Sequence, residues 1–215
     1  MNINLKKSIG SFPPAAFLII CSYFFLDKEI ALFVRKTLMS KARLDILSTS
    51  IPDILFPLVC AITGIAWTVY FHLKRKGVFN THSRFFQLVA ISVPFAFFLK
   101  SILKHQVGRI NTRFWLLHPG FQEFHLFHGS RNYSGFPSGH MAVFTVLITA
   151  LWRFYPRYRP TYVVFLSVLA AALIVTDYHF LSDVIAGAYL GLMVDFCTLR
   201  GLALMRNSKQ GNMTL

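Results

Sequence analysis

The chain has 215 residues, of which 55% are hydrophobic and only 14% are charged, and its formal net charge is +14. Such a composition excludes an ordinary soluble domain, and the grouping of the apolar residues into long runs is typical of a polytopic membrane protein. The basic residues cluster at the ends of these runs, where they set topology and contact lipid headgroups. We therefore expect a membrane partner and no nucleic acid.

Six apolar runs predict six membrane spans in one integral membrane domain, residues 1–215. The spans cover residues 12–26, 51–73, 85–103, 138–154, 161–176 and 181–204. The first follows a short basic flank without a small-residue cleavage site, so we expect it to remain uncleaved. Residues 27–50 mix charged and apolar side chains, which predicts either a helix lying at the interface or a loop. The fold class is all-α, a six-transmembrane-helix bundle with an extramembrane active-site loop.

Neither the cysteines nor the loop histidines predict a metal site. The cysteines lie in apolar runs without metal-ligand spacing, and their odd number argues against a disulfide framework. The histidines of the long polar loop match no familiar metal motif. These residues are Cys21, Cys60, Cys197, His105, His118, His125 and His128.

A polar island at residues 136–140 opens directly into the fourth apolar run. Ser138 is a favoured helix cap, and proline favours a helix start, so Ser138 to His140 predict a helix N-terminus at the edge of the membrane. Such an end offers unpaired N–H groups and a partial positive charge, which suit a phosphate group. His140 stands beside that anion site and can carry a proton near neutral pH.

Two further polar islands supply cations and a second histidine. The first, Lys104 to Arg113, follows the third apolar run, and the second, Asp177 to Asp183, separates the last two runs. His179 and Asp183 are four residues apart, so a helix would place them on one face, where the carboxylate can orient the imidazole. The alternative is a purely structural pair inside a bundle. Together the three islands predict phosphoryl transfer.

The basic residues also indicate the orientation in the membrane. With six spans both termini lie on one side, and that side holds more lysine and arginine, so we expect cytoplasmic termini. All three polar islands then lie on the opposite, periplasmic or extracytoplasmic, side. Their agreement on one side supports a shared site.

The three islands resemble the motifs of the type 2 phosphatidic acid phosphatase family, which shares its site with the vanadium haloperoxidases. The family pattern is Lys-x6-Arg-Pro, then Pro-Ser-Gly-His, then Ser-Arg-x5-His-x3-Asp. The second motif is intact at residues 137–140, and the third ends correctly with His179 and Asp183. The resemblance covers about residues 100–191, and the six-span plan extends it.

The chain departs from the family pattern at two places. Asn111 and Thr112 stand where the first motif has arginine and proline, counted from Lys104. Ala172 and Leu173 stand where the third motif has serine and arginine. One expected phosphate-binding arginine is therefore missing and another is displaced or missing.

The resemblance implies a catalytic set and a substrate-binding set. His179 attacks phosphorus and forms a phosphohistidine, Asp183 holds its tautomer, and His140 protonates the leaving oxygen and then activates water. The substrate-binding candidates are Lys104, Arg109, Asn111, Arg113, Ser138 and Gly139, with Arg131 as a further substitute for a missing arginine. No metal or other cofactor is expected, because cations and backbone donors stabilise the charge. We expect the Lys100 side chain to extend toward the membrane surface rather than to bind the phosphate.

The predicted function is that of a metal-independent membrane phosphatase of a lipid phosphomonoester or diphosphate. Candidate substrates are phosphatidic acid, phosphatidylglycerophosphate, a polyprenyl diphosphate and a lipid A phosphate. The alternatives are a lipid phosphotransferase and a non-catalytic phospholipid-binding protein derived from the family. The expected location is the bacterial inner membrane, with the site facing the periplasm.

Overall fold

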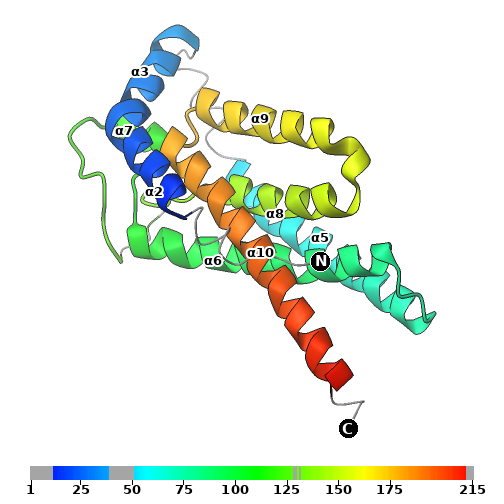
Figure 1. Ribbon diagram of the computed structural model, residues 1–215. Helices are drawn as coiled ribbons and strands as arrows, with labels where there is room; N and C mark the ends of the chain where they lie inside the picture. The colour runs from blue at the N-terminus through cyan, green and yellow to red at the C-terminus, as the bar shows by residue number, and fades with distance from the viewer. Residues whose placement is uncertain (1–11, 39–50, 128–129, 131, 212–215) are drawn as a thin grey trace.

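The computed structural model describes residues 12–38, 51–127, 130 and 132–211, which form an all-helical fold (Figure 1). The elements in chain order are α2 (Phe12–Cys21), the π-helix η1 (Ser22–Leu26), α3 (Asp27–Leu38), α5 (Ile51–Arg75), α6 (Thr81–Val107), α7 (Thr112–Leu117), α8 (Gly139–Phe154), the 3₁₀ turn η2 (Pro156–Tyr158), α9 (Arg159–Val175) and α10 (Leu181–Gly211). No strand occurs among the described residues.

Four of these helices are long and apolar enough to cross a membrane, namely α5, α6, α9 and α10, and α8 is a shorter apolar helix. Each matches one of the predicted spans, which confirms the all-α, multi-pass membrane architecture. Large apolar side chains such as Phe98 and Val168 are 62% exposed on these helices. Lipid tails would cover such surfaces, since a bilayer solvates apolar side chains as a protein core does.

The segment predicted as the first span is organised differently. Helix α2 passes through η1 into α3 with αR backbone at both junction residues, Cys21 and Asp27, so residues 12–38 form one uninterrupted helix. The charged residues after Leu26 therefore do not end the helix, because the first of them, Asp27, is buried against α10 rather than solvated. The helical reading of residues 27–50 holds for 27–38, and residues 39–50 lie outside the described part of the chain.

Helices α8 and α10 cross in close contact (Figure 1). A Cβ on Gly187 would lie 2.4 Å from the Ser138 carbonyl oxygen, and one on Gly191 would lie 2.5 Å from that of Ala142. Only glycine allows these two backbones to approach so closely. The contact brings the N-terminus of α8 beside the N-terminus of α10, where two of the polar islands lie.

The chain reverses after α6 at Gly108, whose positive φ of 52° ends the helix. The loop then folds back on itself, since Ile110 N–H donates to Glu123 C=O at 2.9 Å and His125 N–H donates to Gly108 C=O at 2.8 Å. A Cβ on Gly108 would lie 1.8 Å from the His125 carbonyl oxygen, so this position requires glycine. The reversal turns Arg109 inward, toward α10.

Candidate active site

The Pro137–His140 island forms the N-terminus of α8, as the sequence predicts. Ser138 is the N-cap, and its hydroxyl accepts a hydrogen bond from the Met141 N–H at 3.4 Å. The Ser138 side chain is fully buried, and Gly139 is the first helical residue. The first-turn N–H groups and the positive end of the helix dipole are therefore available at this end for an anion.

The predicted pair of His179 and Asp183 is brought together just beside this helix end. His179 precedes α10, which begins only at Leu181, and the loop turns its ring so that Nδ1 lies 3.7 Å from Asp183 Oδ2. The same carboxylate oxygen accepts the Phe180 N–H at 3.1 Å. Both side chains are almost completely buried. The carboxylate thus faces the imidazole from the first turn of α10.

Burial sets the protonation state of His179. Loss of solvent lowers its pKa below the ordinary value, and the nearby Lys104 acts in the same direction, although Asp183 opposes both. Neither ring nitrogen has a hydrogen-bond partner among the described residues. A neutral imidazole with an unengaged Nε2 lone pair is the form in which histidine acts as a nucleophile.

His140 lies near this pair, in the first turn of α8. The Tyr178 ring contacts both histidines, with its centroid 5.8 Å from that of His140 and 5.0 Å from that of His179. The two imidazoles therefore share one aromatic neighbour. His140 is held by a helix, whereas His179 is held by the loop that precedes α10.

Two lysines of α6, one turn apart, approach the same region. Lys104 Nζ donates to the Ser134 carbonyl at 2.6 Å, in the loop just before α8. Lys100 runs along α8, with its Cδ 3.2 Å from where a Cβ on Gly139 would lie, and its ammonium is 4.0 Å from the centroid of the Phe97 ring. The sequence reading of Lys100 as a snorkelling residue missed this contact, because only the tertiary packing reveals it.

Arg109 is held by carboxylates rather than directed into open space. Its Nη1 donates to Asp183 Oδ1 and to Ser182 Oγ, both at 2.6 Å, and its Nη2 donates to Asp27 Oδ2 at 2.7 Å. The guanidinium is 3% exposed and lies 4.4 Å from the centroid of the Phe180 ring. The sequence placed Arg109 at the phosphate, but in the structure its charge is balanced by two buried carboxylates, so it supports Asp183 from behind.

Asp27 is a site residue that the sequence analysis did not identify. Its Oδ1 accepts the Ser182 N–H at 2.9 Å, and its Oδ2 accepts from both Arg109 and the Ser182 hydroxyl. No motif contains this residue, and it lies in the helix that precedes α5. Its one sequence signal is a carboxylate directly after an apolar run, which we read as the start of an interfacial segment.

The remaining substrate-binding candidates lie on the α7 side of the site. The backbone N–H of Asn111, the α7 N-cap, donates to the Asn132 carbonyl at 2.8 Å. Arg113 donates from Nε and Nη2 to the Thr176 carbonyl at 3.1 and 2.9 Å, and it lies 5.3 Å from the Tyr178 ring. Arg113 therefore buttresses the loop that carries His179. Arg131 lies outside the described residues.

Leu173, at the motif position of an arginine, is buried in an apolar cluster with Met141 and Val184. The α9 segment therefore offers packing at this point and no charge. Among the described residues, no group of three or more histidine, cysteine or acidic side chains is arranged to hold a metal ion.

Comparisons with known proteins identify the family and the fold of the chain. A sequence profile described as the PAP2 superfamily matches residues 85–204, which is more than half of the chain. The lipid A 1-phosphatase of Rhizobium johnstonii (strain DSM 114642 / LMG 32736 / 3841) is 29% identical over 107 residues, covering 50% of this chain and 43% of that protein. The chain thus matches less than half the length of this curated relative.

A solved structure shares the fold. The crystal structure of the first transmembrane PAP2 type phosphatidylglycerolphosphate phosphatase from Bacillus subtilis superposes with a TM-score of 0.56 at 19% sequence identity, covering 94% of this chain and 98% of that one. The region that matches the family profile includes all three polar islands, the helices α8 and α9, and most of α6 and α10. The chain belongs to the PAP2 superfamily.

Proposed function

We propose that the protein is a membrane lipid phosphatase that works through a phosphohistidine on His179. The observation that carries the proposal is the pairing of the buried His179 with Asp183, next to the N-terminus of α8 that bears His140. The substrate is a phosphomonoester or diphosphate of a lipid. Phosphatidylglycerophosphate and a lipid A phosphate are the first candidates, since the two similar proteins are named for them.

The first chemical step forms a bond between His179 and phosphorus. Nε2 attacks the phosphorus atom, while the Nδ1–H faces the Asp183 carboxylate, which stabilises the positive charge that develops on the ring. The bond between phosphorus and the lipid oxygen breaks, and His140 gives its proton to that oxygen. The dephosphorylated lipid then leaves.

The second step restores the enzyme with water. His140, now neutral, takes a proton from a water molecule as that water attacks the phosphohistidine. The bond between phosphorus and nitrogen breaks, inorganic phosphate leaves, and His179 is again neutral. Every proton and bond is accounted for by these two histidines and water, so the scheme requires no metal.

The phosphoryl oxygens need positive charge during both steps. In this proposal Lys104, Lys100 and the first-turn N–H groups of α8 provide it, and the Ser138 cap holds that turn in place. Arg109 positions Asp183 instead of touching the substrate. In this proposal Lys104 is the lysine of the first family motif, and Lys100 takes the place of an arginine that the family motif has and this chain lacks.

The positive-inside distribution supports an orientation with cytoplasmic termini and an outward-facing site in a bacterial inner membrane. A green fluorescent protein fused after Leu215 tests this orientation. It should fluoresce in cells, because the fluorophore matures in the cytoplasm. A dark but stably expressed fusion would contradict the orientation and leave the chemistry unaffected.

The decisive experiment measures phosphate release by the detergent-purified protein from a panel of lipid phosphates, in the presence of a chelator. The panel includes phosphatidic acid, phosphatidylglycerophosphate, undecaprenyl diphosphate and lipid A. We expect release from at least one lipid and its loss by at least about 10²–10⁴-fold in His179→Ala. The exposed His72 on α5 gives a matched control, His72→Ala, which should retain activity.

The proposal fails if the folded protein releases phosphate from no lipid. Asn111 and Leu173, in place of the motif arginines, favour one alternative for that outcome, a phospholipid-binding protein without turnover. A phosphotransferase would instead transfer the phosphoryl group to a second lipid, so each assay is repeated with added acceptor lipids. With a substrate labelled in its phosphate group, label that stays on His179 until an acceptor lipid is added, without release of inorganic phosphate, would identify a phosphotransferase.

A further inference from the structure

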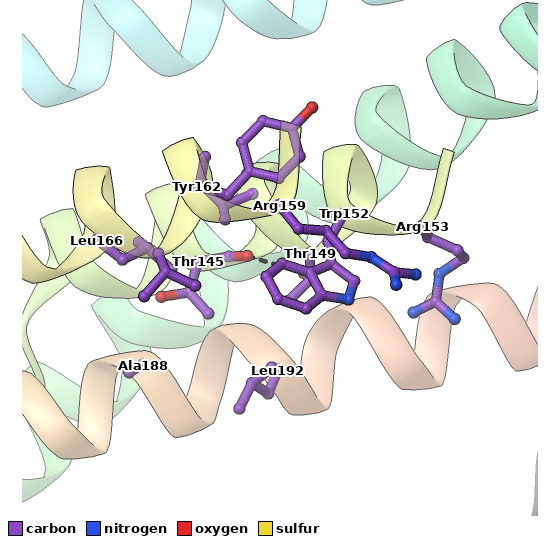
Figure 2. A pocket seen from close by; sticks show the side chains of 11 residues that line it. Thr145, Thr149, Trp152, Arg153, Arg159, Tyr162, Leu166, Ala188 and Leu192 are labelled. Carbon is purple, nitrogen blue, oxygen red and sulfur yellow. Dashed lines mark hydrogen bonds between the residues drawn. The ribbon is translucent and has the colours of Figure 1, made fainter. Parts of the chain in front are cut away.

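A cavity that is separate from the catalytic histidines lies between α8, α9 and α10 (Figure 2). It measures about 650 Å³, which is in the range of cavities that hold organic ligands. Its walls are mainly apolar, with Leu166 from α9 and Ala188 and Leu192 from α10. The same three residues line an adjoining cavity of about 430 Å³. The two cavities form one apolar groove along α10, which suits an acyl chain.

Two arginines and a tryptophan stand at one end of this groove. Arg159 lies over the Trp152 ring, with its guanidinium carbon 5.1 Å from the ring centroid (Figure 2). Arg153 is paired with the buried Asp195 of α10, which balances its charge. No carboxylate pairs with Arg159 among the described residues, and its side chain is exposed. The end of the groove therefore carries a net positive charge.

This charged end lies at the face of the bundle opposite the catalytic site. Arg153 follows Gly139 by 14 residues in the same helix, which corresponds to about 21 Å along the helix axis. Tryptophan and arginine at such a position are typical of the boundary between headgroups and acyl chains. The depth and the charge together match one kind of molecule, an anionic phospholipid of the leaflet opposite the active site.

The groove also contains a buried polar group without a partner. Thr145 is 3% exposed, and its hydroxyl makes no hydrogen bond to any described residue. Thr145 lines the groove one turn of α8 before Thr149, between the arginines and the catalytic end. A lipid with ester groups could accept this hydrogen bond, whereas a plain hydrocarbon could not.

We propose that this groove is a binding site for an anionic phospholipid, with its phosphate at Arg159 and an acyl chain between α9 and α10. The bound molecule is not the substrate, because the phosphate lies at the end of α8 remote from His140. The lipid would fill the gap that separates α9 from α10 and so fasten α9 to the bundle. The proposal is independent of the phosphatase function, since it requires binding and no turnover.

Trp152 gives a direct readout of occupancy. The chain has three tryptophans, so Trp67→Phe with Trp115→Phe leaves Trp152 as the sole tryptophan. This protein, in detergent, is titrated with brominated phosphatidylglycerol or with brominated phosphatidylcholine, since bromine quenches tryptophan at contact distance. For each variant, the fluorescence with brominated lipid is divided by the fluorescence of the same variant without brominated lipid. We expect the Trp152 fluorescence to be half quenched at a mole fraction of brominated phosphatidylglycerol about fivefold lower than that of brominated phosphatidylcholine. This factor corresponds to the attraction between one cationic side chain and an anionic headgroup.

The key comparison is between two arginines two residues from each other on the chain. Arg159→Gln should abolish the preference for the anionic lipid. Arg157→Gln, which removes an exposed charge outside the groove, should preserve it. Ala188→Leu, which narrows the groove, should weaken quenching by both lipids. Circular dichroism and gel filtration confirm that each variant is folded.

Three results would overturn the proposal. Equal quenching by both lipids would show a groove without headgroup recognition. Equal loss of preference in Arg157→Gln and Arg159→Gln would show general surface attraction. Displacement of the brominated lipid by a short-chain lipid phosphate in proportion to its binding at the catalytic site would assign the groove to the substrate.

Discussion

Ser138 and Asp183 are joined by a backbone hydrogen bond, in which the Ser138 N–H donates to the Asp183 carbonyl at 3.0 Å. One residue caps α8 and the other lies in the first turn of α10, so the bond ties the anion-binding helix end to the carboxylate that faces His179. The geometry of the site therefore depends on how closely the two helices pack.

Gly187 controls this packing, and its substitution should separate the helices. In Gly187→Ala the new Cβ would lie 2.4 Å from the Ser138 carbonyl oxygen, which is backbone and cannot rotate away. We expect a loss of about 1–3 kcal/mol of stability and a clear loss of activity. Thermal unfolding in detergent and phosphate release measure the two effects.

A matched control lies on the same helix. A Cβ on Gly201 would meet nothing within 4 Å. Gly201→Ala should therefore be neutral or stabilise the helix by up to about 1 kcal/mol. If both variants behave alike, helix propensity rather than the α8–α10 contact explains the result.

Arg109 should affect turnover more than substrate binding. Arg109→Lys keeps the positive charge but loses the fork that engages Asp27, Ser182 and Asp183 together. Because the variant disturbs the carboxylate that faces His179, we expect kcat to fall while KM changes little. A rise in KM with constant kcat would instead show that Arg109 contacts the phosphate.

Removal of a single partner from the same network should destabilise the folded protein. Arg109→Met leaves two carboxylates buried without a cation, which should cost about 3–5 kcal/mol. Asp27→Asn removes one of these charges, and in the Arg109→Met background it should recover part of the lost stability. Thermal unfolding of the single and double variants tests this coupling. Additive losses would contradict a shared network.

Lys100 should contribute to phosphate affinity even though it stands outside the family motif. Its side chain runs beside Gly139 at the anion-binding helix end. In Lys100→Gln we expect kcat/KM to fall roughly tenfold or more, as for loss of a charge-assisted hydrogen bond, and competitive inhibition by inorganic phosphate to weaken. Lys76→Gln, at an exposed position beyond α5, is the control. If inorganic phosphate inhibits Lys100→Gln as strongly as it inhibits the wild type, Lys100 does not bind phosphate and has only a packing role.

His140 should matter most when the leaving group is poor. A general acid assists departure of a lipid alkoxide far more than departure of an aryl oxide, which is stable without a proton. His140→Gln should therefore lose about 10²–10⁴ in rate on a lipid phosphate and much less on p-nitrophenyl phosphate. Burst kinetics with the aryl substrate would reveal accumulated phosphohistidine, because water activation is still impaired. Equal losses on both substrates would contradict the acid role.

Asp177 should make stability depend on pH. Burial raises its pKa to about 6, against the opposing charges of Arg113 and Arg35, and neither carboxylate oxygen has a hydrogen-bond partner among the described residues. A carboxyl whose pKa is raised on folding favours the folded state when protonated, and this advantage is lost as pH rises from about 4 through 6. Asp177→Asn should thus raise the melting temperature at pH 8 and have little effect at pH 4.

Asparagine is the appropriate replacement at this position. Asp177 has a φ of 53°, and asparagine tolerates the left-handed region better than most residues. The wild-type protein is expected to show the steeper loss of stability between about pH 4 and pH 6. A parallel pH dependence in wild type and variant would assign the titration to another group.

The helical architecture and the helix cap at the Pro137–His140 island could be predicted from the sequence. Apolar runs predict membrane helices because the bilayer requires every backbone group to be paired within its segment. The cap at Ser138 followed from local chemistry. The proximity of His179 and Asp183 was predicted from helical spacing, although the structure achieves it with a loop that turns His179 toward the first turn of α10. These features depend on neighbouring residues, so no tertiary information was needed.

Other features depend on contacts between distant segments and could not be predicted. From its neighbours in the sequence, Asp27 is predicted to begin an interfacial segment. The neighbouring residues give no sign that it is buried against Ser182. Arg109 has the spacing of a phosphate ligand, and only the fold reveals two carboxylates around it. Asp195, for which the sequence offers no partner, pairs with Arg153 across the α8–α10 contact.

The buried position of Asp27 has a consequence for how the protein is made. Asp27 leaves the ribosome 82 residues before Arg109 and 155 residues before Ser182, because synthesis runs from the N-terminus. During that interval its carboxylate has neither partner, and burial of an uncompensated charge is costly. The full set of hydrogen bonds to Asp27 can therefore form only after Ser182, at the start of the last helix, has been synthesised, so this part of the site is completed late in biogenesis.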